Sequence, residues 1–242
     1  MRISRIYISG PLAVGDTITL PEGAANHCAR VLRLREGAPL ILFNGEGGEY
    51  RAALSLVEKR RVEAVIEGFD AREVESPLHV VIAQAISKGE RMDYTLQKSV
   101  ELGASHFVPL TTERTVVNLK GDRADKRVEH WQGVVISACE QSGRNRVPEV
   151  EEIQDFKQWL DGLGEGLKLV LHHRAPVNLK ELPVPQGPVI LLIGPEGGLS
   201  EQEIALAEEA GFVSLCLGPR VLRTETAALT ALAALQLQWG DF

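Results

Sequence analysis

Two apolar runs near the end of the chain each lead into a glycine-proline loop and then into a helix. The first run, Ile190 to Ile193, enters a loop at Gly194 to Ser200, and the second, Val213 to Leu217, enters a loop at Gly218 to Thr226. In open α/β sheets, ligands bind where loops leave the carboxyl ends of the strands. Glycine allows close backbone approach to a ligand, and proline stiffens the loop. The two loops are therefore predicted to form one binding site.

From Leu78 onward, β-type and helical patterns alternate along the chain. Strands are expected at residues 78–86, 105–110, 167–172, 189–193 and 213–217, and helices at 91–102, 125–142, 200–211 and 226–239. Ser200 and Glu203 form a capping box that predicts the start of one helix. Such alternation indicates an α/β fold with a mostly parallel sheet covered on both faces.

Residues 1–72 have a different character. Short β-rich runs and the glycine-rich hairpin loop 44–48 indicate a small β domain, with one helical segment expected at 24–35. The charged, proline-containing segment 71–77 lacks apolar periodicity and marks a boundary. Two domains, 1–72 and 73–242, are therefore expected.

The net charge of −7 does not exclude an RNA partner, because the charge is unevenly distributed. Residues 1–72 carry ten Lys/Arg and nine Asp/Glu, whereas the remainder carries sixteen and twenty-four. Local basic patches matter more than total charge for RNA binding. Arg5, Arg30, Arg33 and Lys88 are the expected RNA-binding residues, although Arg30 and Arg33 fit an ordinary solvated helix face about equally well.

Several classes of protein are disfavoured by what the sequence lacks. No dinucleotide-binding glycine fingerprint follows the first strand of the α/β region, and no phosphate-binding P-loop is present. The cysteines and histidines show no metal-ligand spacing, so no metal is expected. No apolar stretch reaches membrane-spanning length and no signal-peptide core follows Met1, so a cytoplasmic location without membrane contact is expected.

The late loops resemble the knotted SPOUT class of methyltransferases, and more narrowly the RsmE family, which methylates N3 of a uridine in 16S rRNA. The resemblance rests on the loop segments 194–198 and 217–226. Further matching segments occur in order at 25–33, 88–92, 98–103, 112–114 and 140–144, so that the match spans nearly the whole chain.

This resemblance implies a PUA-like β-barrel followed by a SPOUT domain with a deep trefoil knot. It also implies a homodimer that uses S-adenosyl-L-methionine (SAM) as cofactor and acts on 16S rRNA or the small ribosomal subunit. The expected cofactor-binding residues come from three strand ends and the loops that follow them: Leu171, His172, Ile193, Gly194, Pro195, Glu196, Gly197, Gly198, Leu217, Gly218, Val221, Leu222 and Thr224.

Methylation of uridine N3 removes an imide proton and spreads negative charge onto O2 and O4. Cationic donors near those oxygens would stabilise that charge. Arg223 is the first candidate for this task, followed by Arg114 and Arg144, and Glu225 or Glu196 is a candidate general base. Each glutamate could instead anchor loop amides or pair with an arginine, and taken singly this structural role is favoured for each. The base is therefore left open, since positioning and arginine electrostatics could suffice.

Two other functions remain compatible with the residues. A non-catalytic RNA-binding or ribosome-assembly factor could retain the fold without binding SAM. A methyltransferase acting on a ribose 2′-hydroxyl or on another base would keep the cofactor and change the target.

Overall fold

The computed structural model describes residues 3–59, 61–117, 119–172, 175, 177 and 179–242 of the chain. The chain forms two compact units. The first comprises residues 1–75 and 139–147, and the second comprises 76–138 and 148–242. The expected division into 1–72 and 73–242 does not account for the stretch 139–147, which the sequence pattern places in the later part of the chain.

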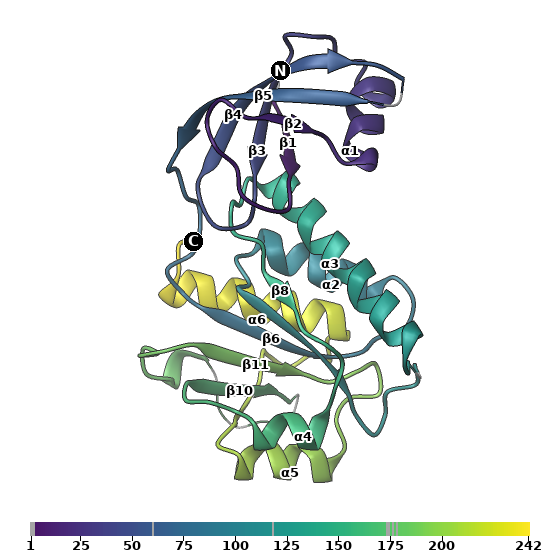
Figure 1. The fold of residues 1–242 in the computed structure, drawn as a ribbon. Helices are drawn as coiled ribbons and strands as arrows, with labels where there is room; N and C mark the ends of the chain where they lie inside the picture. The colour runs from purple at the N-terminus through teal and green to yellow at the C-terminus, as the bar shows by residue number, and fades with distance from the viewer. Residues whose placement is uncertain (1–2, 60, 118, 173–174, 176, 178) are drawn as a thin grey trace. The chain divides into compact units, whose positions relative to one another are not determined.

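The first unit is built on a mostly antiparallel five-stranded sheet in the order β1-β3-β4-β5-β2, in which only β1 and β3 pair in parallel. Its strands are β1 (Ser4–Tyr7), β2 (Thr17–Thr19), β3 (Pro39–Phe43), β4 (Glu49–Val57) and β5 (Val62–Asp70), labelled in Figure 1. The core consists of inward-facing aliphatic side chains such as Leu40, Leu42, Leu54 and Ile66. The β domain predicted from the sequence is present, and its β-rich runs form the strands.

The helical segment of this unit differs from the expected helix at residues 24–35. It consists of α1 (Glu22–Asn26) and a π-helix (His27–Val31). The amide of Leu32 bonds to the carbonyl of His27, five residues back, and this spacing defines the wider π turn. The helical segment ends before Arg33, whose φ of 53° does not fit a right-handed helix.

The stretch 139–147 is held in the first unit by buried polar contacts. Arg144 donates from Nε to Glu75 Oε2 over 3.0 Å, and Arg5 donates to Asn145 Oδ1 over 2.6 Å. Asn145 in turn donates to the carbonyl of Arg72 over 2.6 Å. These partners lie far apart in the sequence, so the sequence pattern could not reveal them.

The second unit contains a parallel sheet in the order β12-β10-β11-β6-β7-β8, with β9 also paired to β7. Its strands are β6 (Val80–Ala85), β7 (His106–Thr111), β8 (Glu149–Val150), β9 (Gln154–Asp155), β10 (Leu167–Leu171), β11 (Val189–Ile193) and β12 (Val213–Leu215). The central strand β11 is buried along its whole length. Apolar runs of this kind are typical of strands covered on both faces.

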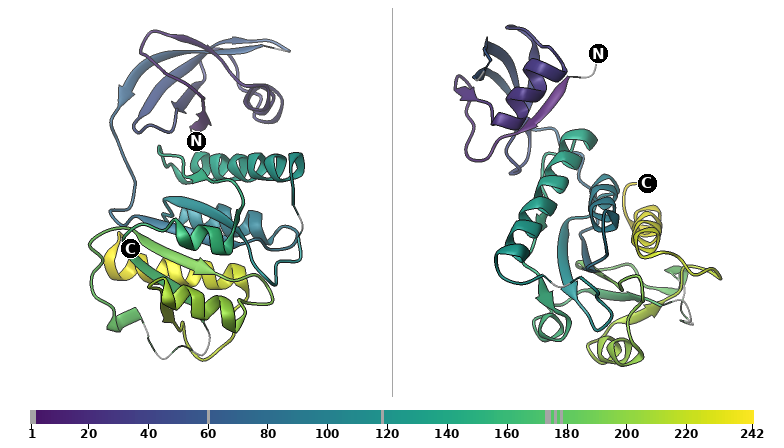
Figure 2. Two further views of the ribbon diagram at one scale, coloured as in Figure 1. Left: turned by 60° about the horizontal axis from the view of Figure 1, so that its bottom comes forward. Right: turned by 90° about the vertical axis from the view of Figure 1, so that its right-hand side faces the viewer.

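Helices lie on both faces of this sheet (Figures 1 and 2). They are α2 (Arg91–Glu101), α3 (Asp122–Ser142), α4 (Phe156–Asp161), α5 (Glu201–Glu209) and α6 (Thr224–Trp239), with a short 3-10 turn at Leu179–Glu181. Phe156, Trp159 and Phe212 form a core with one face of the sheet, next to α4 and α5. Helices α2, α3 and α6 lie on the opposite side.

The mostly parallel α/β architecture predicted from the alternating pattern is confirmed. Several boundaries differ by a few residues: for example, β12 ends at Leu215 rather than Leu217, and α6 begins at Thr224 rather than Thr226. The short elements β8, β9 and α4 were not predicted; the two strands have only two residues each, which is too short to produce a periodic pattern. The trefoil knot stays a prediction.

Across the described residues, no helix has both the length and the apolar character needed to cross a lipid bilayer.

Candidate functional site

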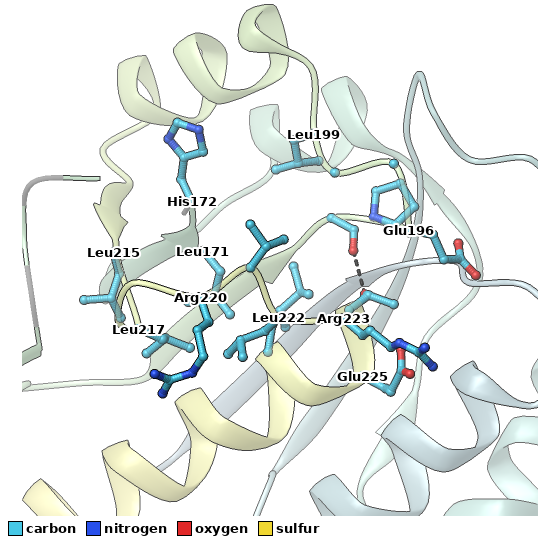
Figure 3. A pocket seen from close by; sticks show the side chains of 18 of the residues that line it. Leu171, His172, Glu196, Leu199, Leu215, Leu217, Arg220, Leu222, Arg223 and Glu225 are labelled. Atoms are coloured by element: carbon cyan, nitrogen blue, oxygen red, sulfur yellow. Dashed lines mark hydrogen bonds between the residues drawn. The ribbon is translucent and has the colours of Figure 1, made fainter. Parts of the chain in front are cut away.

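A cavity of about 460 Å³ opens at the carboxyl ends of β10, β11 and β12 (Figure 3). These three strands are adjacent and parallel, so their ends lie at the same edge of the sheet. Leu171 and His172 come from the end of β10, Ile193 and the following glycine loop from β11, and Leu215 and Leu217 from β12 and the segment after it. The cavity lies where ligands bind in open parallel sheets.

All thirteen residues predicted to bind the cofactor line this cavity. They are Leu171, His172, Ile193, Gly194, Pro195, Glu196, Gly197, Gly198, Leu217, Gly218, Val221, Leu222 and Thr224. The strand ends and loops predicted to form one site therefore do form one cavity. Their individual roles in binding stay predictions.

The first loop is so compact that its backbone leaves no room for a side chain at Gly194. A Cβ at this position would lie 2.8 Å from the backbone nitrogen of Leu199. In the second loop, Gly218 has a φ of 116°, which side-chain-bearing residues rarely adopt. Both glycines are thus required by the backbone, and the loops they shape form the wall of the cavity.

Helix α5 fixes the far end of the first loop. The Ser200 hydroxyl accepts from the Glu203 amide, and the Glu203 carboxylate accepts from the Ser200 amide over 2.8 Å. The same carboxylate also accepts from the Glu113 amide over 2.8 Å. The capping box predicted from the sequence is confirmed, and it ties the glycine loop to the segment after β7.

A hydrogen bond joins the two loops directly. The hydroxyl of Thr224, the first residue of α6, donates to the Gly194 carbonyl over 2.7 Å. Thr224 is 6% exposed, so little water competes for this bond. The start of α6 is thereby held against the end of β11.

An ion-pair cluster lies at the cavity wall. Glu196 accepts from the Lys88 amide and from Arg91 Nη1, each over 2.8 Å, and Arg91 Nε lies 4.0 Å from Glu225 Oε1. Burial favours the neutral acid of Glu196, but these hydrogen bonds and the charge of Arg91 outweigh it, so the pKa of Glu196 is lowered. Glu196 is therefore ionised and fixed as an anchor, which is the structural role that the sequence left open.

The candidate catalytic residues occupy three different environments. Arg223 and Glu225, on either side of Thr224, both line the cavity. Arg114 lies beside it and donates from Nη1 to the Gly197 carbonyl over 2.8 Å, so it supports the glycine loop. Arg144 belongs to the first unit and is 5% exposed against Glu75, which favours a structural role over catalysis.

The expected RNA-binding residues also separate by environment. The guanidinium of Arg5 is buried, forms a salt bridge with Glu49 and stacks 5.0 Å from the ring centroid of Phe43. This placement favours a structural role for Arg5 over contact with RNA. Arg30, Arg33 and Lys88 are exposed and remain available to a ligand.

Five further residues line the cavity that the sequence reading did not single out: Arg91, Leu199, Leu215, Arg220 and Ala227. Arg91 could have been found, because it follows β6, and β6 pairs in parallel with β11. Loops after neighbouring parallel strands share one edge of the sheet. The other four lie within or next to the segments already predicted.

Within the described part of the chain, no group of three or more His, Cys, Asp or Glu side chains is arranged to hold a metal ion.

Two family models match the chain. The RNA methyltransferase domain model matches residues 74–236, and the RNA methyltransferase PUA domain model matches residues 20–67. The first covers the parallel sheet and the cavity, and the second covers most of the N-terminal sheet. The PUA-like character implied by the resemblance is thereby confirmed.

Similar proteins match over nearly their whole length. Ribosomal RNA small subunit methyltransferase E from Buchnera aphidicola (Schizaphis graminum) is 36% identical over 99% of this chain and 98% of its own. The protein of that name from Bacillus subtilis is 34% identical over 92% of this chain and 90% of its own.

Solved structures give the same picture. Ribosomal RNA small subunit methyltransferase E from Neisseria gonorrhoeae, crystallised with SAM, is 45% identical with a TM-score of 0.93 over the full length of both chains. A methyltransferase from Legionella pneumophila in complex with SAM is 43% identical with a TM-score of 0.97, also over both full chains. The chain therefore belongs to the ribosomal RNA small subunit methyltransferase E family.

Proposed function

We propose that the protein transfers a methyl group from SAM to N3 of a uridine in the 16S rRNA of the small ribosomal subunit. The observation that carries this proposal is the cavity at the ends of β10, β11 and β12, which gathers all the predicted cofactor residues. Its place in the sheet suits a nucleotide-like ligand. The relatives crystallised with SAM support the choice of cofactor.

The residues present fit SAM chemically. Leu171, Leu215, Leu217 and Leu222 supply apolar surface for an adenine ring. The backbone groups of the two loops are placed to meet its polar edge and the ribose. The carboxylate of Glu225 provides negative charge at the wall for the cationic end of the cofactor. When bound, SAM supplies an activated methyl group.

The chain's own contribution to the reaction would be positioning and charge stabilisation. Arg223 is exposed at the cavity and makes no salt bridge with any described residue. A free guanidinium can donate to O2 or O4 of a uridine as negative charge develops there. Glu225, two residues further along, is the candidate acceptor for the N3 proton.

RNA contact in the first unit is proposed for the segment that contains the π-helix. Asn26, Arg30 and Lys59 line a second cavity of about 460 Å³, and Arg33 lies just beyond the π-helix in the left-handed region. Both rare backbone conformations are enriched at functional sites. Replacing Arg30 and Arg33 with alanine should weaken rRNA binding and flatten its salt dependence, as measured by filter binding across a salt series.

A homodimer is proposed from the composition of α6. From Thr226 to Trp239 this helix contains no charged residue, and Leu237 is 69% exposed. A long helical surface without charged residues is typical of helices that are covered on all sides. A second copy of the chain would cover the outer side of α6. Sedimentation of the wild type beside Leu237→Glu tests this proposal, since a charge in the interface should shift the protein to monomers.

Calorimetric titration with SAM is the direct test of the cofactor site. Leu217→Trp should fill part of the cavity and abolish measurable binding. Val184→Trp, at a position 63% exposed in the same unit and away from the cavity lining, should bind like the wild type. Absence of binding to the wild type, even with rRNA added, would favour a non-catalytic RNA-binding factor instead.

The target atom is tested separately. Incubation with small-subunit rRNA and SAM, followed by digestion and mass analysis of nucleosides, should yield N3-methyluridine. Recovery of a 2′-O-methylated nucleoside would keep the cofactor and change the target. Fractionation of cells tests the expected cytoplasmic location.

A further inference from the structure

A buried amide contacts two residues of the cavity wall, in a position that the proposed chemistry does not use. Gln84 is the penultimate residue of β6 and is 1% exposed. It does not line the cavity. Its Nε2 lies 2.9 Å from the Ala85 carbonyl, 2.9 Å from the Thr224 hydroxyl and 3.5 Å from the Gly194 carbonyl.

The chemistry of these partners determines what can occupy this position. The Thr224 hydroxyl already donates its proton to Gly194, so toward Gln84 it can only accept. The other two atoms are carbonyl oxygens. A donor must therefore face all three oxygens, which assigns the amide nitrogen to this side. The Oε1 atom of Gln84 is buried and has no partner among the described residues.

The hydrogen bonds of Gln84 affect the cavity because Thr224 lies between two residues that line it. Its neighbours Arg223 and Glu225 both line the cavity, and Gly194 begins the glycine loop. Gln84 contacts both loops through one amide group. The direction in which Arg223 and Glu225 project depends on the placement of Thr224 between them.

We propose that Gln84 is a positioning residue for methyl transfer, acting through Thr224 to orient Arg223 and to hold the two cofactor loops together. The inference rests on the proposed function and deepens it. A small displacement of a positioned group, of about 1 Å, can reduce turnover by about a hundred-fold. One buried amide at the end of β6 is therefore expected to influence chemistry that it does not touch.

A second buried glutamine supplies a matched control. Gln236 in α6 is 0% exposed, donates from Nε2 to the Leu102 carbonyl over 3.0 Å, and accepts from the Ser76 hydroxyl over 2.6 Å. It lies in the same unit as Gln84 but does not line the cavity. Loss of either amide should cost stability, whereas only Gln84 should affect catalysis.

The experiment compares Gln84→Met with Gln236→Met, using methionine to keep the side-chain length without a donor. Thermal unfolding, the Kd for SAM, and kcat and KM for rRNA are measured for each. Gln84→Met is expected to lower kcat by about ten- to a hundred-fold, with a smaller effect on KM. Gln236→Met is expected to lose as much stability as Gln84→Met does, and to keep the wild-type kcat. Equal kcat for the two variants would overturn the proposal.

Thr224 variants keep the test valid if Gln84→Met fails to fold. Thr224→Val removes the hydroxyl and should lower kcat in the same way, while Thr224→Ser keeps the hydroxyl and should restore it. In an Arg223→Ala background, Thr224→Val should reduce kcat by less than about two-fold further, because residues acting as a unit are not additive. A full additional loss would show that the network does not act through Arg223.

The outcome is separable from that of the proposed function. Wild-type protein that binds SAM but transfers no methyl group would refute the transferase proposal. In that case the Kd for SAM still reports the network, since Gln84→Met and Thr224→Val should each weaken binding and the double variant should add little. If the effects of Gln84→Met and Thr224→Val on the Kd for SAM add in full in the double variant, the proposed coupling between the two residues is wrong.

Discussion

Two buried arginines of the first unit and two exposed arginines at the cavity of the second serve opposite purposes, although the sequence presents them alike. In the first unit, Arg5 and Arg144 are buried and each pairs with a glutamate, with side chains 9% and 7% exposed. At the cavity of the second unit, Arg220 and Arg223 are exposed and form no salt bridge with a described residue. An arginine that is bound to a carboxylate uses its hydrogen-bond donors within the folded protein. An unpaired arginine has donors available for a ligand.

The largest expected effect follows from removing an unpaired arginine. Arg223→Ala should lower turnover by about a hundred- to a thousand-fold, the loss typical of removing one donor to a developing negative charge. The Kd for SAM and the melting temperature should change little. Steady-state kinetics beside calorimetry measures the difference.

Arg127→Ala serves as the control, since Arg127 is exposed on α3 in the same unit and does not line the cavity. Its turnover should equal that of the wild type. Undiminished turnover of Arg223→Ala would contradict the comparison between paired and unpaired arginines.

Removing a paired arginine should act on stability instead. Arg144→Ala leaves Glu75 without its main partner in a largely buried position, and breaking such a pair costs about 3 kcal/mol. Denaturant unfolding measures this loss. At a temperature where the variant stays folded, its Kd for SAM should match the wild type. A large loss of SAM affinity in fully folded variant would contradict the structural role.

Glu140, an acidic residue of the first unit, extends the comparison from arginines to a carboxyl group. Its carboxylate accepts from the Tyr7 amide over 3.0 Å, but burial raises its pKa, with that bond and the charges of His27 and Arg5 opposing the shift. A raised folded pKa means that the stability it contributes is present below the ordinary value of 4.5 and is lost as the pH rises through the folded value.

Glu140→Gln keeps the acceptor and removes the charge, so it should raise the melting temperature slightly at neutral pH, by about 1–2 °C. The gain should vanish in acid, where the wild-type carboxyl is itself protonated. Calorimetric melting across a pH series measures the gap. A lower melting temperature at neutral pH would mean that the Tyr7 hydrogen bond and the charges of His27 and Arg5 outweigh burial.

Glu196 gives the smallest expected effect, and its pKa is shifted in the opposite direction from that of Glu140. Burial of its carboxyl group favours a higher pKa, but the hydrogen bonds from Lys88 and Arg91 prevail, so its pKa is lowered. Its contribution is present above the ordinary value of 4.5 and is lost as the pH falls through the lower folded value.

Glu196→Gln should weaken SAM binding by about two- to three-fold at neutral pH, because partly exposed ion pairs contribute little. Thermal unfolding should show a small deficit for the variant that persists down to the ordinary pKa and closes below it. A deficit that closes well above the ordinary pKa would contradict the lowered value.

The sequence by itself determined the longer strands and helices of the parallel-sheet unit, the small β domain, and the two glycine loops that line the cavity. These features are local: a buried strand, its following loop and a helix start are contiguous in the chain, so their patterns survive without tertiary information. Parallel strands then bring their carboxyl ends to one edge, which is why loops 194–200 and 218–226 could be assigned to one site.

Only the tertiary structure decided which charged and polar groups are available. Nothing in the sequence distinguishes Arg144 from Arg223. In the folded protein, Arg144 is buried against Glu75, whereas Arg223 lines the cavity. Gln84 and Thr224 are 140 residues apart, and no periodicity links them. The free energy of a polar group depends on burial and on partners brought from distant parts of the chain. Those partners exist only once the chain has folded.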